Sequence, residues 1–271
     1  MQNPLLILDG GTGRELARLG APFRQPEWSA LALIEGPAFV STVHSGYVAA
    51  GADVITTNSY AVVPFHIGAE RFAAEGAALA ALAGRLAREV TDAADHPVLV
   101  AGSLPPVCGS YRPDLVDLDR ARPIVATLVA ALDPHVDHWL AETLSSLVEA
   151  ELAAAETKAT GKPLWLSFTL QDEDTSAAPS LRSGESVTQA ARAARDLGAA
   201  ALLFNCSQPE VMAAAIDAAR AELGPDSPIR ADLTPEGYAA FAARWQAAGA
   251  SIIGGCCGIG PEHIIELRRA G

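Results

Sequence analysis

Short apolar runs alternate with longer stretches of helical period along the whole chain. The short runs are rich in aliphatic and β-branched residues, which is typical of strands buried on both faces, whereas the longer stretches carry apolar residues at i, i+3 and i+4. The predicted strands cover 5–9, 53–58, 98–102, 136–142, 164–169, 200–205, a weaker run near Ile229, and 251–254. The predicted helices cover 37–50, 69–91, 119–132, 144–158, 186–197, 209–223, 235–248 and 261–270.

Local signals mark several helix ends. Prolines suit the first helical turn, acidic side chains cap free N–H groups, and glycines end helices in a left-handed conformation. On these grounds we expect first-turn prolines at 209, 235 and 261, a cap at Asp119, and helix ends at Gly51, Gly198 and Gly249.

The repetition of strand and helix decides the predicted architecture. Eight βα units in about 250 residues match an α/β protein of the (β/α)8 TIM-barrel type. No linker or low-complexity tract divides the sequence, so we expect one barrel domain over residues 1–271. A doubly wound open sheet is the alternative.

The composition limits the classes of molecule that the protein is expected to bind. The chain has 19 basic and 32 acidic residues, a net charge of −13, which opposes nucleic acid and anionic membranes and tolerates a cationic or zwitterionic small molecule. The first apolar run is too short for a signal peptide, and no segment is long enough to span a membrane. Four cysteines in a chain of this size do not form a disulfide framework, and a reducing cytoplasm is expected. Nothing in the sequence indicates an oligomeric state.

Cysteines follow two of the predicted strands. Cys206 ends the sixth strand, and Cys256 and Cys257 follow the eighth. Active sites of such barrels lie at the carboxyl ends of the strands, where the glycines around Cys256 and Cys257 allow both side chains to turn inward. Three thiolates with one open coordination position predict a catalytic Zn²⁺ site. The alternatives are small buried apolar residues or a strained vicinal disulfide, and Cys108 is expected to be structural.

This ligand set favours thiol chemistry. Three thiolates make zinc a poor activator of water, yet the metal still deprotonates an incoming thiol. Chemistry at a metal-bound thiolate is therefore the leading hypothesis. A zinc hydrolase or lyase on the same barrel and a non-catalytic zinc- or thiol-binding protein are the alternatives.

Polar residues at other strand ends are candidates for substrate binding. Asp9 and Glu142 would bind an α-amino group, although Asp9 also suits a turn brace. The turn of Gly10, Gly11 and Thr12 would offer N–H groups to a carboxylate. The remaining candidates are Asn58 and Asn205, as orienting groups or local turn formers, and Trp28, whose ring suits a methyl sulfonium or ammonium donor or anchors its loop.

With these residues the chain resembles the homocysteine S-methyltransferase family of zinc barrels, and the resemblance runs end to end. It is carried by LDGGTGREL (8–16), PEWSALAL (26–33), GADVITTNSY (51–60), AGSLPP (101–106), LAETLSSLVEA (140–150), FNCS (204–207) and GASIIGGCCGIGPEHI (249–264).

The resemblance implies roles for these residues. Cys206, Cys256 and Cys257 would be the zinc ligands, Asp9 and Glu142 would hold the homocysteine amino group, and the Gly10-Gly11 turn would meet its carboxylate. The implied reaction is in-line attack of the homocysteine thiolate on an activated methyl group, giving methionine. A small cationic donor, S-methylmethionine or S-adenosylmethionine, is favoured because a lone barrel has no folate or cobalamin module.

One segment departs from the family pattern. Members usually carry a longer loop with a Pro-Asn or Ala-Asn element after the seventh strand, whereas here Asp232 leads almost directly to Pro235. The missing loop would lie on the rim between the cysteine-bearing strands.

Overall fold

The chain forms an α/β fold around one parallel sheet of eight strands. The structure is a computed structural model that describes residues 5–224, 229–233 and 238–270. The strands are β1 (Leu6–Ile7), β2 (Val54–Thr56), β3 (Leu99–Leu104), β4 (His138–Leu144), β5 (Leu164–Phe168), β6 (Ala201–Phe204), β7 (Ile229–Leu233) and β8 (Ile252–Gly255). All eight predicted strands are thus confirmed, including the weak one at Ile229.

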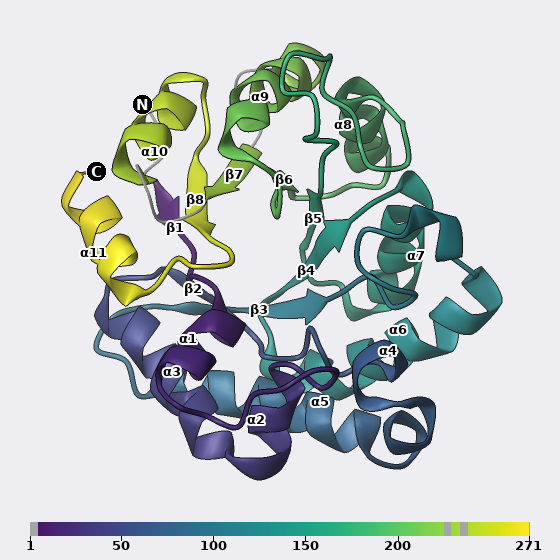
Figure 1. The fold of residues 1–271 in the computed structure, drawn as a ribbon, viewed down its shortest axis with the longest axis vertical. Helices are drawn as coiled ribbons and strands as arrows, with labels where there is room; N and C mark the ends of the chain where they lie inside the picture. Colours follow the sequence, from purple (N-terminus) through teal and green to yellow (C-terminus); the bar gives the residue numbers. More distant parts are fainter. Residues whose placement is uncertain (1–4, 225–228, 234–237, 271) are drawn as a thin grey trace.

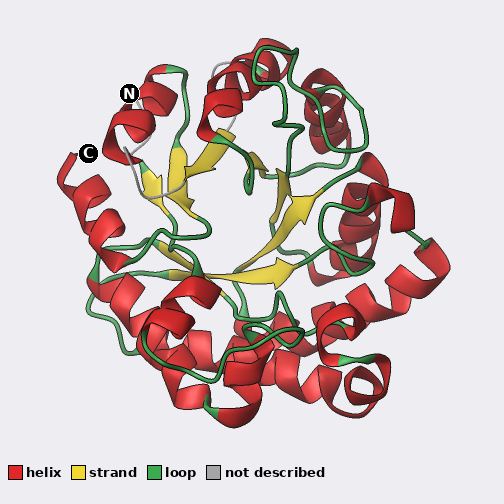
Figure 2. Ribbon diagram, in the orientation of Figure 1, coloured by secondary structure: helices red, strands yellow, loops and turns green. Residues whose placement is uncertain are grey.

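Helices follow the strands and form the outer layer of the molecule (Figures 1 and 2). They are α1 (Thr12–Arg18), α2 (Ala30–Glu35), α3 (Pro37–Ala49), α4 (Pro64–Ile67), α5 (Ala69–Asp92), α6 (Leu118–Leu132), α7 (Leu147–Thr157), α8 (Val187–Asp196), α9 (Pro209–Leu223), α10 (Tyr238–Ala247) and α11 (Pro261–Ala270). Short 3₁₀ turns cover Pro113–Leu115, Asp133–His135 and Lys158–Thr160. The periodicity did not predict α1, α2 and α4, which are too short to show a helical pattern.

Most predicted helix ends are confirmed. Pro209 and Pro261 are first helical residues, and Gly51, Gly198 and Gly249 have positive φ where helices end. The predicted proline start at 235 lies outside the described residues, as does the short junction at 234–237 after β7.

Two helix starts were predicted wrongly. Asp119 does not cap its helix, because the side chain of Asp117 accepts hydrogen bonds from the N–H groups of Asp119 and Arg120. The helix expected to start at residue 144 begins at Leu147 instead. Leu144 still belongs to β4, and Ser146 and Glu149 form a capping box that fixes the later start.

Neighbouring strands of the sheet are parallel, in the order β1-β8-β7-β6-β5-β4-β3-β2. The first and last strands of this order also meet. Leu8 bridges Val54 in parallel, the N–H of Asp9 donates to the carbonyl of Val54 at 2.9 Å, and the N–H of Asp53 donates to that of Ile7 at 2.7 Å. The carboxyl ends of the strands therefore gather at one end of the molecule.

The apolar side chains form two clusters. A larger cluster packs the strands against the helices. A smaller one contains only residues of the strands and their ends, namely Leu8, Val54, Ala101, Leu140, Trp165, Ala201, Leu203 and Ile252. Alternate residues of a strand point to opposite faces, which explains why one sheet supplies both clusters. No helix within the described ranges has the length and apolar character needed to cross a membrane.

Candidate active site

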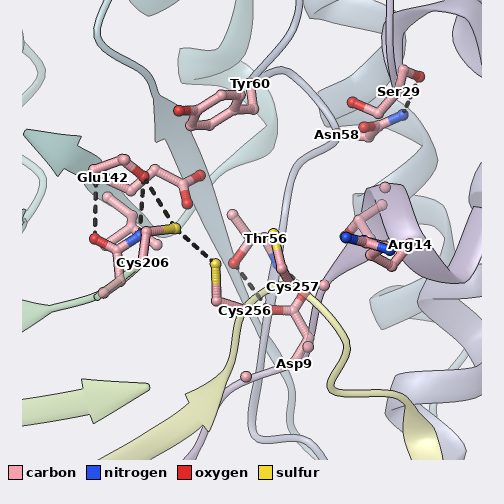
Figure 3. A pocket seen from close by; sticks show the side chains of 18 of the residues that line it. Asp9, Arg14, Ser29, Thr56, Asn58, Tyr60, Glu142, Cys206, Cys256 and Cys257 are labelled. Atoms are coloured by element: carbon pink, nitrogen blue, oxygen red, sulfur yellow. Dashed lines mark hydrogen bonds between the residues drawn. The ribbon is translucent and has the colours of Figure 1, made fainter. Parts of the chain in front are cut away.

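One pocket at the carboxyl ends of the strands brings the sequence-predicted residues together (Figure 3). The space between its walls, with the open mouth included, is about 990 Å³. All of the predicted site residues line it: Asp9, Gly10, Gly11, Thr12, Trp28, Asn58, Glu142, Asn205, Cys206, Cys256 and Cys257. Cys108 is not among the residues that line this pocket.

The thiols of Cys206 and Cys256 are in contact. Cys206 follows β6 and Cys256 follows β8, and their sulfur atoms lie 2.8 Å apart. Cys257 is exposed and lines the same pocket, and its thiol also hydrogen-bonds with that of Cys256. All four cysteines are free thiols, so the vicinal disulfide is absent.

Left-handed backbone lets these thiols converge. Cys206 itself has a φ of 53°, which turns its side chain off the direction of β6. After β8 the turn depends on glycines, as expected: Gly258 has a φ of 91°, and a Cβ on Gly255 would lie 2.2 Å from a side-chain carbon of Ile259. The positive φ of Cys206 was not predicted, because this position is not a glycine.

Asn205 holds the segment that carries Cys206. Its side-chain oxygen, Oδ1, accepts from the N–H of Thr143 at 3.0 Å and from the hydroxyl of Ser167 at 2.8 Å. Its amide nitrogen donates to Thr143 Oγ1 at 2.9 Å and to Cys206 Sγ at 3.4 Å. These bonds tie β4, β5 and β6 together and orient the Cys206 sulfur, so Asn205 is engaged with protein groups.

Two tyrosines cover the side of the pocket next to Cys206. Tyr60 bonds to the hydroxyl of Ser110 at 2.7 Å, and Tyr111 hydrogen-bonds with Cys206. Burial, followed by the negative charge of the nearby Cys206, raises the pKa of both phenols. The guanidinium of Arg182 lies over the Tyr111 ring, 4.9 Å from its centre. Tyr111 has a φ of 62°, unusual for a bulky residue.

The two carboxylates are held by hydroxyl and backbone donors. Asp9 is buried and accepts from the N–H of Thr56 at 2.7 Å and from its hydroxyl at 3.0 Å. Glu142 accepts from the hydroxyl of Ser103 at 2.5 Å. Both carboxyl groups line the pocket, so it presents two acceptor groups held in place to a ligand.

The glycine turn after β1 packs tightly against the cysteine turn after β8. A Cβ on Gly10 would lie 2.1 Å from the carbonyl oxygen of Ile259, and one on Gly11 would lie 2.4 Å from that of Cys256. The N–H of Gly11 donates to the carbonyl of Ile259 at 3.0 Å. These glycines therefore permit close backbone approach, and the Gly11 N–H already has an acceptor within the protein.

Trp28 and Asn58 belong to one loop arrangement. The amide of Asn58 donates to the carbonyl of Ser29 at 3.1 Å, which fixes the loop that carries Trp28. Trp28 packs edge-on against Phe23 and His66 and fills the space beside Gly13. Asn58 thus acts on the loop, and Trp28 is both a loop anchor and part of the pocket wall.

The three thiols suit zinc by their chemistry and need a small adjustment in position. A tetrahedral zinc with bonds of about 2.3 Å places its sulfur ligands about 3.8 Å apart, so Cys206 and Cys256 would separate by about 1 Å. No group of three or more His, Cys, Asp or Glu side chains in the described part of the chain is already spaced as a metal site. Contacts with Cys206, then Cys257, then burial hold the pKa of the Cys256 thiol well above its usual value. A cation among these sulfurs would reverse that effect.

Sequence reasoning missed several residues that shape this pocket. They are Arg14, Thr56, Tyr60, Tyr111 and Thr143. Thr56, Tyr60 and Thr143 lie at or beside the ends of strands already identified, so their positions could have been found. Tyr111 comes from a loop and contacts Arg182, which is distant in the sequence, so no local pattern predicts its position.

The chain matches known proteins over nearly its whole length. Residues 6–271 match the family model described as homocysteine S-methyltransferase. A homocysteine S-methyltransferase of Escherichia coli is 32% identical, with 97% of this chain and 94% of that protein covered. A selenocysteine methyltransferase of Astragalus bisulcatus is 28% identical over 95% and 90%. The metallated form of the homocysteine methyltransferase MmuM from Escherichia coli superposes with a TM-score of 0.84, at 29% identity over 99% of this chain and 97% of MmuM.

Proposed function

Because the chain belongs to the homocysteine S-methyltransferase family, we propose that it transfers a methyl group from a small activated donor to the thiol of homocysteine, giving methionine. One observation carries this proposal: thiols from the ends of β6 and β8 meet in a pocket that also holds two fixed carboxylates. That combination suits a substrate with both a thiol and an ammonium group.

The proposed scaffold is a single (β/α)8 TIM barrel over residues 1–271. The bridge between Leu8 and Val54 supports closure of the sheet, because it joins the two strands at the ends of the pairing order. The separate apolar cluster made of strand residues supports it too, since a closed sheet encloses its own core.

The proposed cofactor is Zn²⁺, with Cys206, Cys256 and Cys257 as ligands. The free thiols and their shared pocket support this ligand set. When bound, zinc lowers the pKa of the substrate thiol so that the reactive thiolate forms at neutral pH. Asn205 is proposed to position Cys206, because its amide reaches that sulfur and is locked by Thr143 and Ser167.

The remaining residues are proposed to bind and align the substrates. Asp9 and Glu142 would take the ammonium group of homocysteine, since both are fixed by neighbouring donors and face the pocket. Trp28 and Tyr60 would line the path of a cationic methyl donor, because aromatic faces attract sulfonium and ammonium groups. Thr12 and Asn58 would shape the same wall. Alignment of thiolate and methyl group would supply much of the acceleration.

The donor is proposed to be a small cation such as S-methylmethionine or S-adenosylmethionine. The net charge of −13 and the carboxylates of the pocket favour a positively charged molecule over an anionic folate.

The test is methionine formation by the zinc-loaded protein. Homocysteine would be supplied with S-methylmethionine, S-adenosylmethionine, betaine or methyltetrahydrofolate in turn, beside a Cys257→Ala variant. We expect methionine from a sulfonium donor with the wild type and a large loss with Cys257→Ala. If the protein binds zinc and homocysteine yet no donor yields methionine, it is a binding protein. Turnover of a substrate by water instead would indicate a zinc hydrolase or lyase.

A further inference from the structure

Arg14 gives the pocket a positive charge. Of the described residues that line it, Arg14 is the only Lys, Arg or His. Figure 3 shows its side chain extending from α1 toward the pocket in which the thiols lie. The turn that carries it is held in place, because Gly11 packs against the backbone of Cys256 and Cys257.

The guanidinium of Arg14 has no carboxylate partner within the described ranges. The contrast is Arg18 in the same helix, whose guanidinium pairs with Glu15 at 2.5 Å. The two pocket carboxylates do not depend on Arg14 either, because Thr56 donates to Asp9 and Ser103 donates to Glu142. Arg14 is therefore left to pair with an anion that enters from solution.

A zwitterionic substrate needs such a group. Within the glycine turn, the Gly11 N–H already donates to the carbonyl of Ile259, so this donor is not available to a substrate carboxylate. A guanidinium binds a carboxylate through two parallel N–H donors, which gives both affinity and orientation. With Asp9 and Glu142 also lining the pocket, the wall then has complementary groups for both charged ends of an amino acid.

We propose that Arg14 is the carboxylate-binding residue of this pocket and recognises the α-carboxylate of an amino-acid substrate. The inference rests on the proposed function in so far as it takes the ligand to be an amino acid. Homocysteine and an amino-acid donor such as S-methylmethionine share this group, and the experiment separates them.

The experiment measures binding by calorimetry with the zinc-loaded protein. The acceptor arm compares homocysteine with 3-aminopropane-1-thiol, and the donor arm compares S-methylmethionine with (3-aminopropyl)dimethylsulfonium. Each pair differs only in the carboxylate. We expect the wild type to prefer the carboxylate form in at least one arm by about 10- to 100-fold, the usual range for a charge-assisted hydrogen bond. The arm that loses this preference in Arg14→Met identifies the substrate.

Two further variants serve as controls. Arg14→Lys keeps the charge without the paired donors and should retain part of the preference. Arg269→Met makes the same substitution on the exposed face of α11, away from the pocket, and should retain all of it. In turnover, Arg14→Met should raise KM for the same substrate and leave kcat unchanged.

The proposal is overturned if the wild type shows no carboxylate preference in either arm, or if Arg14→Met keeps it in both. These results differ from a failure of the proposed function. A wild type that binds with the expected preference but makes no methionine leaves Arg14 as an anion site on a protein with another activity. Methionine formation with an unchanged preference in Arg14→Met removes only the role of Arg14.

Discussion

The sulfur atoms of Cys206 and Cys256 lie 2.8 Å apart, although 50 positions separate the two residues in the chain. Neither residue belongs to a strand. Cys256 directly follows β8 and Cys206 lies two positions after the end of β6, and the parallel pairing of β6 with β7 and of β7 with β8 brings the two ends together. The contact therefore depends on the sheet as a whole, and substitutions that disturb it have testable consequences.

Loss of one of these thiols should release the metal. Cys256→Ser leaves two thiolates in place of three. Removal of a group that only hydrogen-bonds to a metal ligand lowers metal affinity by up to about 100-fold, so we expect the loss of a ligand to lower zinc affinity by more than that. Methionine formation should fall with it and return in the wild type when zinc is restored after chelation. Cys108→Ser is the matched control, because Cys108 lies outside this pocket. Equal zinc content in the two variants would contradict the assigned ligand set.

Removal of the Tyr111 hydroxyl should weaken the metal site without unfolding the protein. Tyr111→Phe keeps the ring under Arg182 but deletes the hydrogen bond to Cys206. We expect zinc affinity to fall by about 10-fold, as for other groups that bond to a ligand atom. Thermal stability should hardly change, because 43% of the Tyr111 surface is exposed. Zinc competition and the thiolate absorption of the Co²⁺-substituted protein measure the effect, and identical values in variant and wild type would argue against this role.

A methyl group on Gly11 should separate the two turns that form the pocket. Its Cβ would lie 2.4 Å from the carbonyl oxygen of Cys256, a backbone atom that cannot rotate away. We expect Gly11→Ala to lower the free energy of unfolding by about 1–3 kcal/mol, as overpacking does, and to reduce zinc binding.

Gly46→Ala is the control for this substitution. Gly46 lies within α3, and a Cβ there would meet its nearest neighbour at 3.5 Å, an ordinary contact. The gain in helix propensity should raise the free energy of unfolding by about 0.5–1 kcal/mol. Urea denaturation measures both variants, and the same sign for the two would refute the argument from close packing.

Acid should destabilise the protein through His44. The ring is fully buried in α3, neither ring nitrogen has a partner in the described chain, and burial lowers its pKa to about 4. The unfolded chain therefore takes up the proton first as pH falls. The contribution of neutral His44 to the free energy of unfolding is fully present above pH 6.5, decreases as pH falls toward 4 and stays constant below pH 4. By pH 5 the loss is about 2 kcal/mol.

The variant His44→Leu should reduce this pH dependence. His138 is buried as well, and burial lowers its pKa to about 4, so the slope between pH 7.5 and 5 should decrease and not vanish. Urea titrations at several pH values give the slope.

Much of the fold follows from local pattern. The alternation of apolar runs and helical stretches predicted all eight strands, and the glycines at 51, 198 and 249 marked helix ends because only they adopt positive φ without strain. Helix starts were less certain. Asp117 caps the helix that Asp119 was expected to cap, and the helix expected to start at residue 144 begins at Leu147, after the Ser146 cap.

The candidate site was also predicted only in part. The strand ends recognised in the sequence predicted that the three cysteines, Asp9 and Glu142 lie on one rim, because the carboxyl ends of parallel strands lie at the same edge of the sheet. The roles of Asn58 and Asn205 were decided by their partners: Asn58 donates to Ser29, and Asn205 bonds to Thr143 and Ser167. The residues next to Asn58 and Asn205 in the sequence do not predict these contacts.

The sequence by itself determined the order of the elements, the positions of the strand ends and the kinds of side chain gathered there, because each depends on the period and chemistry of a few neighbouring residues. Only the tertiary structure decided that two sulfurs meet at 2.8 Å, that Tyr111 reaches Cys206, and that the Gly11 N–H is already bonded while Arg14 faces the pocket. Distances and partners of this kind are set by loops from distant parts of the chain packing on one another, and no local pattern contains them.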